Sequence, residues 1–304
     1  MVKRLLTLAG GFVAVSLVAG AMLAERAVHR PRTRLAPEDH HRASELAAAA
    51  GAAIETVAVQ AGDGARLEGW WFVPARPNGH TVILLHGVTS NRSGLLEHAR
   101  RALSRGYYVL AVDGRGHGAS DGGLIAFGGL EAGDTTQWIE WIRTRRPSGC
   151  VYLIGDSLGA AVAIQASTES TVCAVVAQSA FTGLRDIAFE RVGETLGTGT
   201  WLGRSILRPA IELGFLFVRA RHGVDVASAS AETALAPAGP PVLLIHGERD
   251  RNTPVRHAEV LHQVNPSRVT LWIVPGGTHE GLAAASPDYD DRVFGFLAAH
   301  ARPR

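Results

Sequence analysis

The chain is poor in cysteine, with only Cys150 and Cys173 among its 304 residues. Two cysteines are too few for a disulfide framework or for a cysteine-based metal cluster. Each lies at the start of an apolar run, and we expect the two runs to be neighbouring strands, where a disulfide is geometrically feasible. Buried free thiols are the commoner case, so we expect two unbonded cysteines.

Nucleotide-binding motifs are also lacking. The chain has no P-loop, and no helix-forming sequence follows the glycines of residues 114–118, as a dinucleotide-binding turn requires. The formal net charge is only +2, and beyond residue 42 there are 25 acidic residues against 23 basic ones. No basic surface for nucleic acid is indicated, and we expect neither a nucleic-acid partner nor a cofactor. Adjacent His40 and His41 lack a second ligand pair, so we expect an exposed helix start there and no metal site.

The N-terminal segment contains the longest uncharged apolar run, residues 5–24, with basic residues on both sides. A helix over this run would span about 30 Å, which matches the hydrocarbon core of a bilayer. We expect residues 1–34 to be an uncleaved single-span membrane anchor with a basic flank, its orientation left open. The alternative is a signal peptide cleaved after Ala21, which would give a secreted protein. Residues 35–53 read as a linker with a short helix.

The body of the chain, residues 54–304, alternates apolar runs with helix-forming segments. Two runs, 56–61 and 67–74, are separated by a glycine-aspartate-glycine turn and predict a hairpin. Six further apolar runs follow, most of them separated by helical segments, which predicts an α/β fold with a mainly parallel eight-stranded sheet and helices on both faces. A long insertion, residues 181–240, should carry helices of its own.

Within this insertion, apolar residues recur at helical spacing at positions 207, 211, 215 and 218. A stripe of this kind has two interpretations. It either covers a binding site as a lid, in which case an apolar acyl group would bind beneath it, or it packs as a helix pair on the sheet edge.

The strongest candidate for a catalytic residue is Ser157. The sequence VYLIGDSLGA, Val151–Ala160, runs from a strand pattern through Gly-Asp-Ser-Leu-Gly into a helix-forming stretch. A serine on such a sharp strand-to-helix turn presents its hydroxyl to substrate, and the amide of Leu158 lies at a helix N-terminus where it can stabilise an oxyanion. A second G-x-S-x-G around Ser120 has no flanking strand or helix, so we interpret it as a turn.

Two polar residues that follow later strands complete a candidate triad. Asp250 follows the apolar run 241–247, and His279 follows the run 269–275. Carboxyl ends of parallel strands meet at one edge of an open sheet, so we expect both side chains to converge on Ser157. The histidine would accept the serine proton and the aspartate would orient the histidine. Glu248, two residues from Asp250, is the closest rival for the acid; Asp113 is expected instead to bond backbone amides of the glycine-rich loop.

These motifs, with LLHGVTSNR at residues 84–92 and VDGRGHGAS at residues 112–120, resemble those of the α/β-hydrolase superfamily. The resemblance extends in particular to bacterial membrane-tethered hydrolases related to the serine aminopeptidase-like group. It implies an α/β-hydrolase fold with a short helical lid insertion, and it implies that the backbone N–H of Val88 joins that of Leu158 in the oxyanion hole.

We therefore expect a serine hydrolase that cleaves a small-molecule ester, thioester or amide through an acyl-enzyme on Ser157. A serine peptidase or aminopeptidase would use the same triad, although no amine-binding feature is identifiable in the insertion. An acyltransferase would replace water with an alcohol. A non-catalytic, membrane-tethered binding protein is disfavoured because such a protein would be free to lose any member of the Ser-Asp-His set.

Overall fold

The computed structural model describes residues 2–146, 148–168, 172–195, 197 and 200–301. Its centre is one eight-stranded sheet with the order β1-β2-β4-β3-β5-β6-β7-β8. The strands are β1 Ala52–Gln60, β2 Arg66–Pro74, β3 Thr81–Leu85, β4 Tyr108–Val112, β5 Val151–Asp156, β6 Val172–Gln178, β7 Val242–Gly247 and β8 Val269–Val274. Only the pairs β1/β2 and β2/β4 are antiparallel. The predicted mainly parallel sheet is confirmed.

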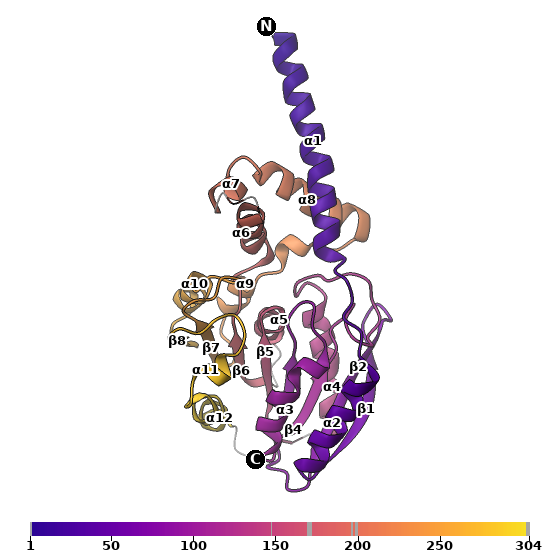
Figure 1. Ribbon diagram of the computed structural model, residues 1–304, viewed down its shortest axis with the longest axis vertical. Helices are drawn as coiled ribbons and strands as arrows, with labels where there is room; N and C mark the ends of the chain where they lie inside the picture. The colour runs from indigo at the N-terminus through magenta and orange to yellow at the C-terminus, as the bar shows by residue number, and fades with distance from the viewer. Residues whose placement is uncertain (1, 147, 169–171, 196, 198–199, 302–304) are drawn as a thin grey trace.

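Helices cover both faces of this sheet (Figure 1). The central strands read as continuous apolar runs because both of their faces are buried, and every residue of β3, β4 and β6 is buried. Three helices pack on one face: α2 Pro37–Ala49, α3 Leu96–Leu103 and α12 Tyr289–Ala299. Four pack on the other: α4 Glu131–Arg145, α5 Leu158–Ala166, α9 Ala231–Leu235 and α10 Arg256–Val264. Short helices η1 Arg92–Leu95 and α11 Leu282–Ala285 lie in the connections.

The predicted hairpin is β1 and β2, which are in register from Ala52 opposite Pro74 to Gln60 opposite Arg66. The insertion carries helices of its own, as expected. Besides α9 they are α6 Leu184–Thr195, α7 Thr200–Arg204, α8 Arg208–His222 and η2 Val226–Ser228. Figure 1 shows α6, α7 and α8 grouped beyond one end of the sheet, beside the N-terminal helix.

The N-terminal helix α1, Val2–Val28, packs along α8. Small residues allow the close approach: a Cβ on Gly20 would lie 2.1 Å from the carbonyl oxygen of Ala210, and one on Gly214 would lie 2.6 Å from that of Gly20. Of the expected stripe, Ile211 and Val218 are buried. The helix α8 therefore serves as a packing partner of α1, an arrangement that neither interpretation of the stripe anticipated.

Within the described part of the chain, no helix combines the length and the apolarity needed to cross a membrane. The span predicted at residues 5–24 includes positions 5–10 and 12, whose side chains lie outside that part. The span thus stays a prediction from the sequence.

The expectation of two free thiols was wrong, because Cys150 and Cys173 form a disulfide with a Cα–Cα distance of 5.6 Å. Cys150 immediately precedes β5, and Cys173 sits where the pairing register between β5 and β6 shifts. The two side chains therefore lie side by side on neighbouring parallel strands, within one buried cluster. The expectation rested on how often buried cysteines are unbonded in general, and that frequency does not depend on how two particular strands pair.

Candidate active site

Ser157 lies at the junction of β5 and α5, with the left-handed backbone angles φ 52° and ψ −110°. A non-glycine residue held there stores roughly 1–3 kcal/mol of strain, which the surrounding structure must offset. The flanking glycines make the turn feasible: a Cβ on Gly155 would lie 2.2 Å from the carbonyl oxygen of Gly159, and one on Gly159 would lie 2.1 Å from that of Leu85. The strand and helix can therefore approach closely, and the serine side chain projects from the turn.

The structure brings His279 and Asp250 to this serine. The Ser157 hydroxyl is 3.0 Å from Nε2 of His279, and Nδ1 of the same ring is 2.8 Å from Oδ2 of Asp250. Since a carboxylate only accepts, Nδ1 carries the ring proton and Nε2 is left to accept the serine proton. A Ser179 hydroxyl that donates to the backbone carbonyl of His279 (3.2 Å) holds the histidine loop in place. The three predicted side chains thus form one continuous hydrogen-bonded chain.

Asp250 is buried, which by itself opposes ionisation of its carboxyl group. Hydrogen bonds from His246 and His279, together with the backbone N–H of Thr253, outweigh burial and hold the pKa of Asp250 well below its usual range. The backbone amides of Asn252 and Thr253 each donate to Oδ1 at 2.8 Å. The carboxylate is therefore charged and fixed in orientation at any pH near neutrality.

The rival residues are held elsewhere. Glu248 is exposed, and its Oε2 accepts from the backbone N–H of Gly276 (2.8 Å). Each carboxylate oxygen of Asp113 accepts one hydrogen bond from a backbone amide: Oδ1 from Arg92 (2.7 Å) and Oδ2 from Ala119 (2.8 Å). Ala119 belongs to the glycine-rich loop, as expected. Ser120 is fully buried and donates to the carbonyl of Asp113 (2.8 Å), which agrees with the turn interpretation.

The two predicted oxyanion donors flank the serine. Leu158 begins α5 directly after Ser157, and Val88 belongs to the loop after β3. That loop lies against the serine, because a Cβ on Gly87 would be 3.4 Å from the Cβ of Ser157. Within the described residues, neither donor N–H is hydrogen-bonded to another group of the protein, so both are free to bind a substrate oxygen.

His86 supports the loop that carries Val88. Its Nδ1 donates to the carbonyl of Gly87 (2.8 Å) and its Nε2 accepts from the amide of Gly114 (3.0 Å). Burial, reinforced by the nearby ring of His117, lowers the pKa of His86 to about 4. The imidazole is therefore neutral near pH 7, as the two bonds require.

A polar network behind the serine was not foreseen from the sequence. His98 on α3 bonds Asp156 (3.0 Å), Gln178 donates to the other oxygen of Asp156 (2.6 Å), and the hydroxyl of Tyr289 donates to Gln178 (3.0 Å). Burial works against charge on His98, but the Asp156 carboxylate outweighs it, so the pKa of His98 is raised. One signal for this network was present in the sequence, the position of Asp156 next to Ser157. His98 belongs to no recognisable sequence motif.

Two other features of the described residues bear on ligands. A cavity is lined by Leu158 together with residues such as His86, Asp113, Glu131 and Trp138, and its lining includes none of the three triad residues. The single group of three side chains spaced for a metal ion among the described residues lies at the contact of α1 with α8. His40 and His41 are exposed on the first turns of α2.

Comparison with known proteins gives matches over most of the chain. Residues 82–294 match the alpha/beta hydrolase family. The protein YqkD of Bacillus subtilis is 25% identical over 204 residues, which are 66% of this chain and 65% of YqkD. YfhR of Escherichia coli O157:H7 is 29% identical over 264 residues, 82% of each chain. This chain thus spans just under two thirds of YqkD and most of YfhR.

A solved structure with the same architecture is the esterase Pf2001 of Pyrococcus furiosus, with a TM-score of 0.68 and 26% identity. The superposition covers 89% of this chain and 98% of the esterase.

Proposed function

Because the chain belongs to the alpha/beta hydrolase family, we propose that it is a serine hydrolase that cleaves a small-molecule carboxylic ester through an acyl-enzyme on Ser157. The observation that carries this proposal is the hydrogen-bonded chain from Ser157 through His279 to Asp250, at 3.0 and 2.8 Å. The fixed, ionised carboxylate of Asp250 and the two free amides of Val88 and Leu158 supply the other elements that acyl transfer needs.

In the proposed reaction, Oγ of Ser157 attacks the ester carbonyl while its proton passes to Nε2 of His279. The carbonyl oxygen becomes an oxyanion held by the amides of Val88 and Leu158, and Asp250 stabilises the imidazolium. Collapse expels the alcohol, which takes the proton from His279. Water then attacks the acyl-enzyme with His279 again as the base, and the product acid leaves as Ser157 regains its proton.

The choice of an ester is supported by the likeness to the Pyrococcus furiosus esterase at 26% identity. An amide or peptide substrate would use the same residues, and so would transfer to an alcohol in place of water.

The disulfide between Cys150 and Cys173 bears on where the protein works. Disulfides persist in oxidising compartments and are rare in the cytosol. We place the hydrolase domain on the oxidising side of a membrane or outside the cell.

A substrate panel tests the proposed function. The purified chain should hydrolyse p-nitrophenyl acetate and butyrate and should release the free acid, with little turnover of aminoacyl p-nitroanilides. Ser157→Ala should abolish hydrolysis, whereas Ser104→Ala, at an exposed serine that caps α3, should leave it unchanged. Faster cleavage of the anilides than of the esters, or an acylated alcohol as the main product, would replace the esterase assignment with a peptidase or an acyltransferase.

A further inference from the structure

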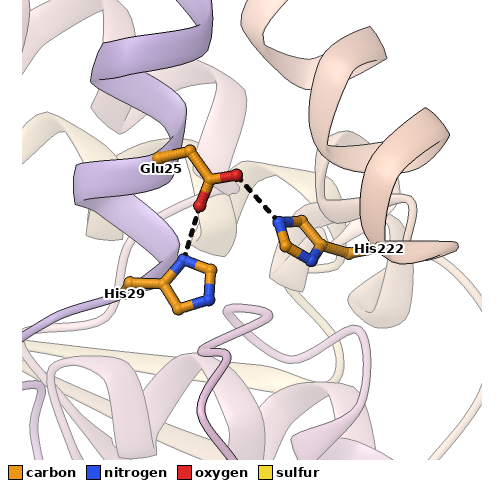
Figure 2. Close-up of side chains that lie close together, drawn as sticks. All are labelled: Glu25, His29 and His222. Atoms are coloured by element: carbon orange, nitrogen blue, oxygen red, sulfur yellow. Dashed lines mark hydrogen bonds and ion pairs between the residues drawn. The ribbon is translucent and has the colours of Figure 1, made fainter.

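The contact of α1 with α8 assembles a second constellation of side chains, formed by Glu25, His29 and His222 (Figure 2). Nδ1 of His29 is 2.7 Å from one carboxylate oxygen of Glu25, and Nε2 of His222 is 3.1 Å from the other. One donor atom from each of the three side chains lies within 4.8 Å of the other two. Two imidazoles and one carboxylate from two separate segments therefore lie close together, with one ring at each carboxylate oxygen.

The backbone holds these side chains in place. Glu25 and His29 are one helical turn apart, and the amide of His29 still donates to the carbonyl of Glu25 (2.9 Å), so the turn continues through His29. His222 is the last residue of α8, which Gly223 caps in the left-handed conformation, φ 70°. The glycine contacts between α1 and α8 described above fix the two helices against each other. A site on two packed helices is more rigid than one on a loop.

We propose that Glu25, His29 and His222 bind one divalent transition-metal ion, with zinc as the ion that this donor set suits best. Two histidines and one carboxylate are a common zinc ligand set, with a solvent water completing a tetrahedron. Ligands of tetrahedral zinc lie about 3.4 Å apart, given bonds of about 2.0–2.1 Å. Nδ1 of His29 and Oε2 of Glu25 are already closer than this, at 2.7 Å, and Nε2 of His222 approaches the other carboxylate oxygen at 3.1 Å. The exposed fraction of the His29 side chain, 43%, leaves that ring free to turn, so small rotations of the rings would bring one atom from each side chain to the ion.

Arg221 also contacts this group, since its Nε lies 3.0 Å from the Glu25 oxygen Oε1 that faces His222. A cation there would disfavour a metal if Glu25 had to ligate through that oxygen. Glu25 has a second oxygen, Oε2, which contacts Nδ1 of His29. On metal binding this contact would be replaced by ligation of both atoms to the ion, while Oε1 stays bonded to Arg221. Arginine would then orient the carboxylate, as outer hydrogen bonds do at many metal sites.

The ion would join two parts of the chain that are far apart in sequence. Glu25 lies in the last turn of α1 and His29 directly follows that helix, whereas His222 ends the longest helix of the insertion. A bound metal would therefore clamp α1 to the insertion, independently of the hydrolase chemistry at Ser157.

Zinc titration of the full-length chain, stripped with a chelator and followed by calorimetry at pH 7.5, tests this site. We expect one zinc ion per chain and a rise in melting temperature on binding. Glu25→Gln and His222→Ala should each weaken the affinity by at least about tenfold, since loss of an outer partner alone costs that much at known sites. The matched control is His41→Ala, because His41 pairs with Glu45 at the same helical spacing, 3.1 Å apart, on α2.

Circular dichroism of each metal-free variant checks that the fold is intact. If His222→Ala does not fold, then Glu25→Gln, which keeps the side-chain shape, and His29→Ala, at a half-exposed ring, decide the question. Unchanged affinity in the variants that fold, or an equal loss in His41→Ala, would overturn the site.

Discussion

The replacement of Asp250 by asparagine separates the catalytic role of this residue from its structural role. The carboxylate oxygen Oδ1 accepts from the amides of Asn252 and Thr253 at 2.8 Å, and the asparagine carbonyl can keep both bonds. The other oxygen, Oδ2, accepts from Nδ1 of His279 at 2.8 Å, and there the variant presents an NH₂ group that can only donate. The loop should therefore stay folded while the histidine loses its acceptor.

The expected loss follows from the tautomer of His279. Facing a donor, Nδ1 must give up its proton, so Nε2 carries the proton and points it at Ser157, 3.0 Å away. The ring then cannot accept the serine proton, and the imidazolium also loses its buried counter-charge. The same change in a Ser-His-Asp triad costs about 10⁴-fold in kcat, or about 5.5 kcal/mol of transition-state stabilisation.

The assay is the initial rate of p-nitrophenyl butyrate hydrolysis for the wild type and for Asp250→Asn, with urea unfolding to show that both are folded. Glu248→Gln is the matched control, because it removes a nearby exposed carboxylate but keeps an acceptor for Gly276; its kcat should stay within about twofold of the wild type. A kcat for Asp250→Asn near the wild-type value, with a large loss in Glu248→Gln, would refute the assignment of the acid.

Three further predictions concern stability. The raised pKa of His98 means that its ion pair contributes stability fully below about pH 6.5 and loses it as pH rises through the raised value. The difference in free energy of unfolding between the wild type and His98→Asn should therefore shrink between pH 6 and pH 9, and a constant difference would contradict the pairing. Gly159→Ala, whose Cβ would meet the Leu85 carbonyl oxygen at 2.1 Å, should lower the free energy of unfolding by about 3 kcal/mol and reduce activity. Reduction of the disulfide from Cys150 to Cys173, which closes a loop over a sequence separation of 23, should cost about 3 kcal/mol in urea unfolding; no change would argue against the bond.

Features carried by strand ends were predictable from the sequence. Eight apolar runs separated by turns or helices specify a mainly parallel sheet, and the sheet in turn sets the carboxyl ends of β5, β7 and β8 along one edge. For that reason Ser157, Asp250 and His279 could be expected to meet although up to 122 positions separate them. The turn at Ser157 was also predictable from the sequence, because a Cβ at either flanking glycine would clash with the backbone.

Features that depend on how helices dock were not predictable. His98 belongs to no sequence motif, and it reaches Asp156 only because of the position in which α3 packs on the sheet. The approach of Cys150 to Cys173 depends on the local pairing of β5 with β6, which an apolar pattern does not encode. The apolar spacing of α8 indicated a buried face, but nothing in that spacing identified α1 as the partner.

Active-site labelling tests the central claim most directly. The folded protein is treated with a fluorophosphonate, digested and mapped by mass spectrometry, alongside Ser157→Ala and Ser120→Ala. The account predicts one modified residue, Ser157, because its hydroxyl is hydrogen-bonded to Nε2 of His279 in the triad, while Ser120 is fully buried. Labelling should persist in Ser120→Ala and disappear in Ser157→Ala; label that survives in folded Ser157→Ala would contradict the account.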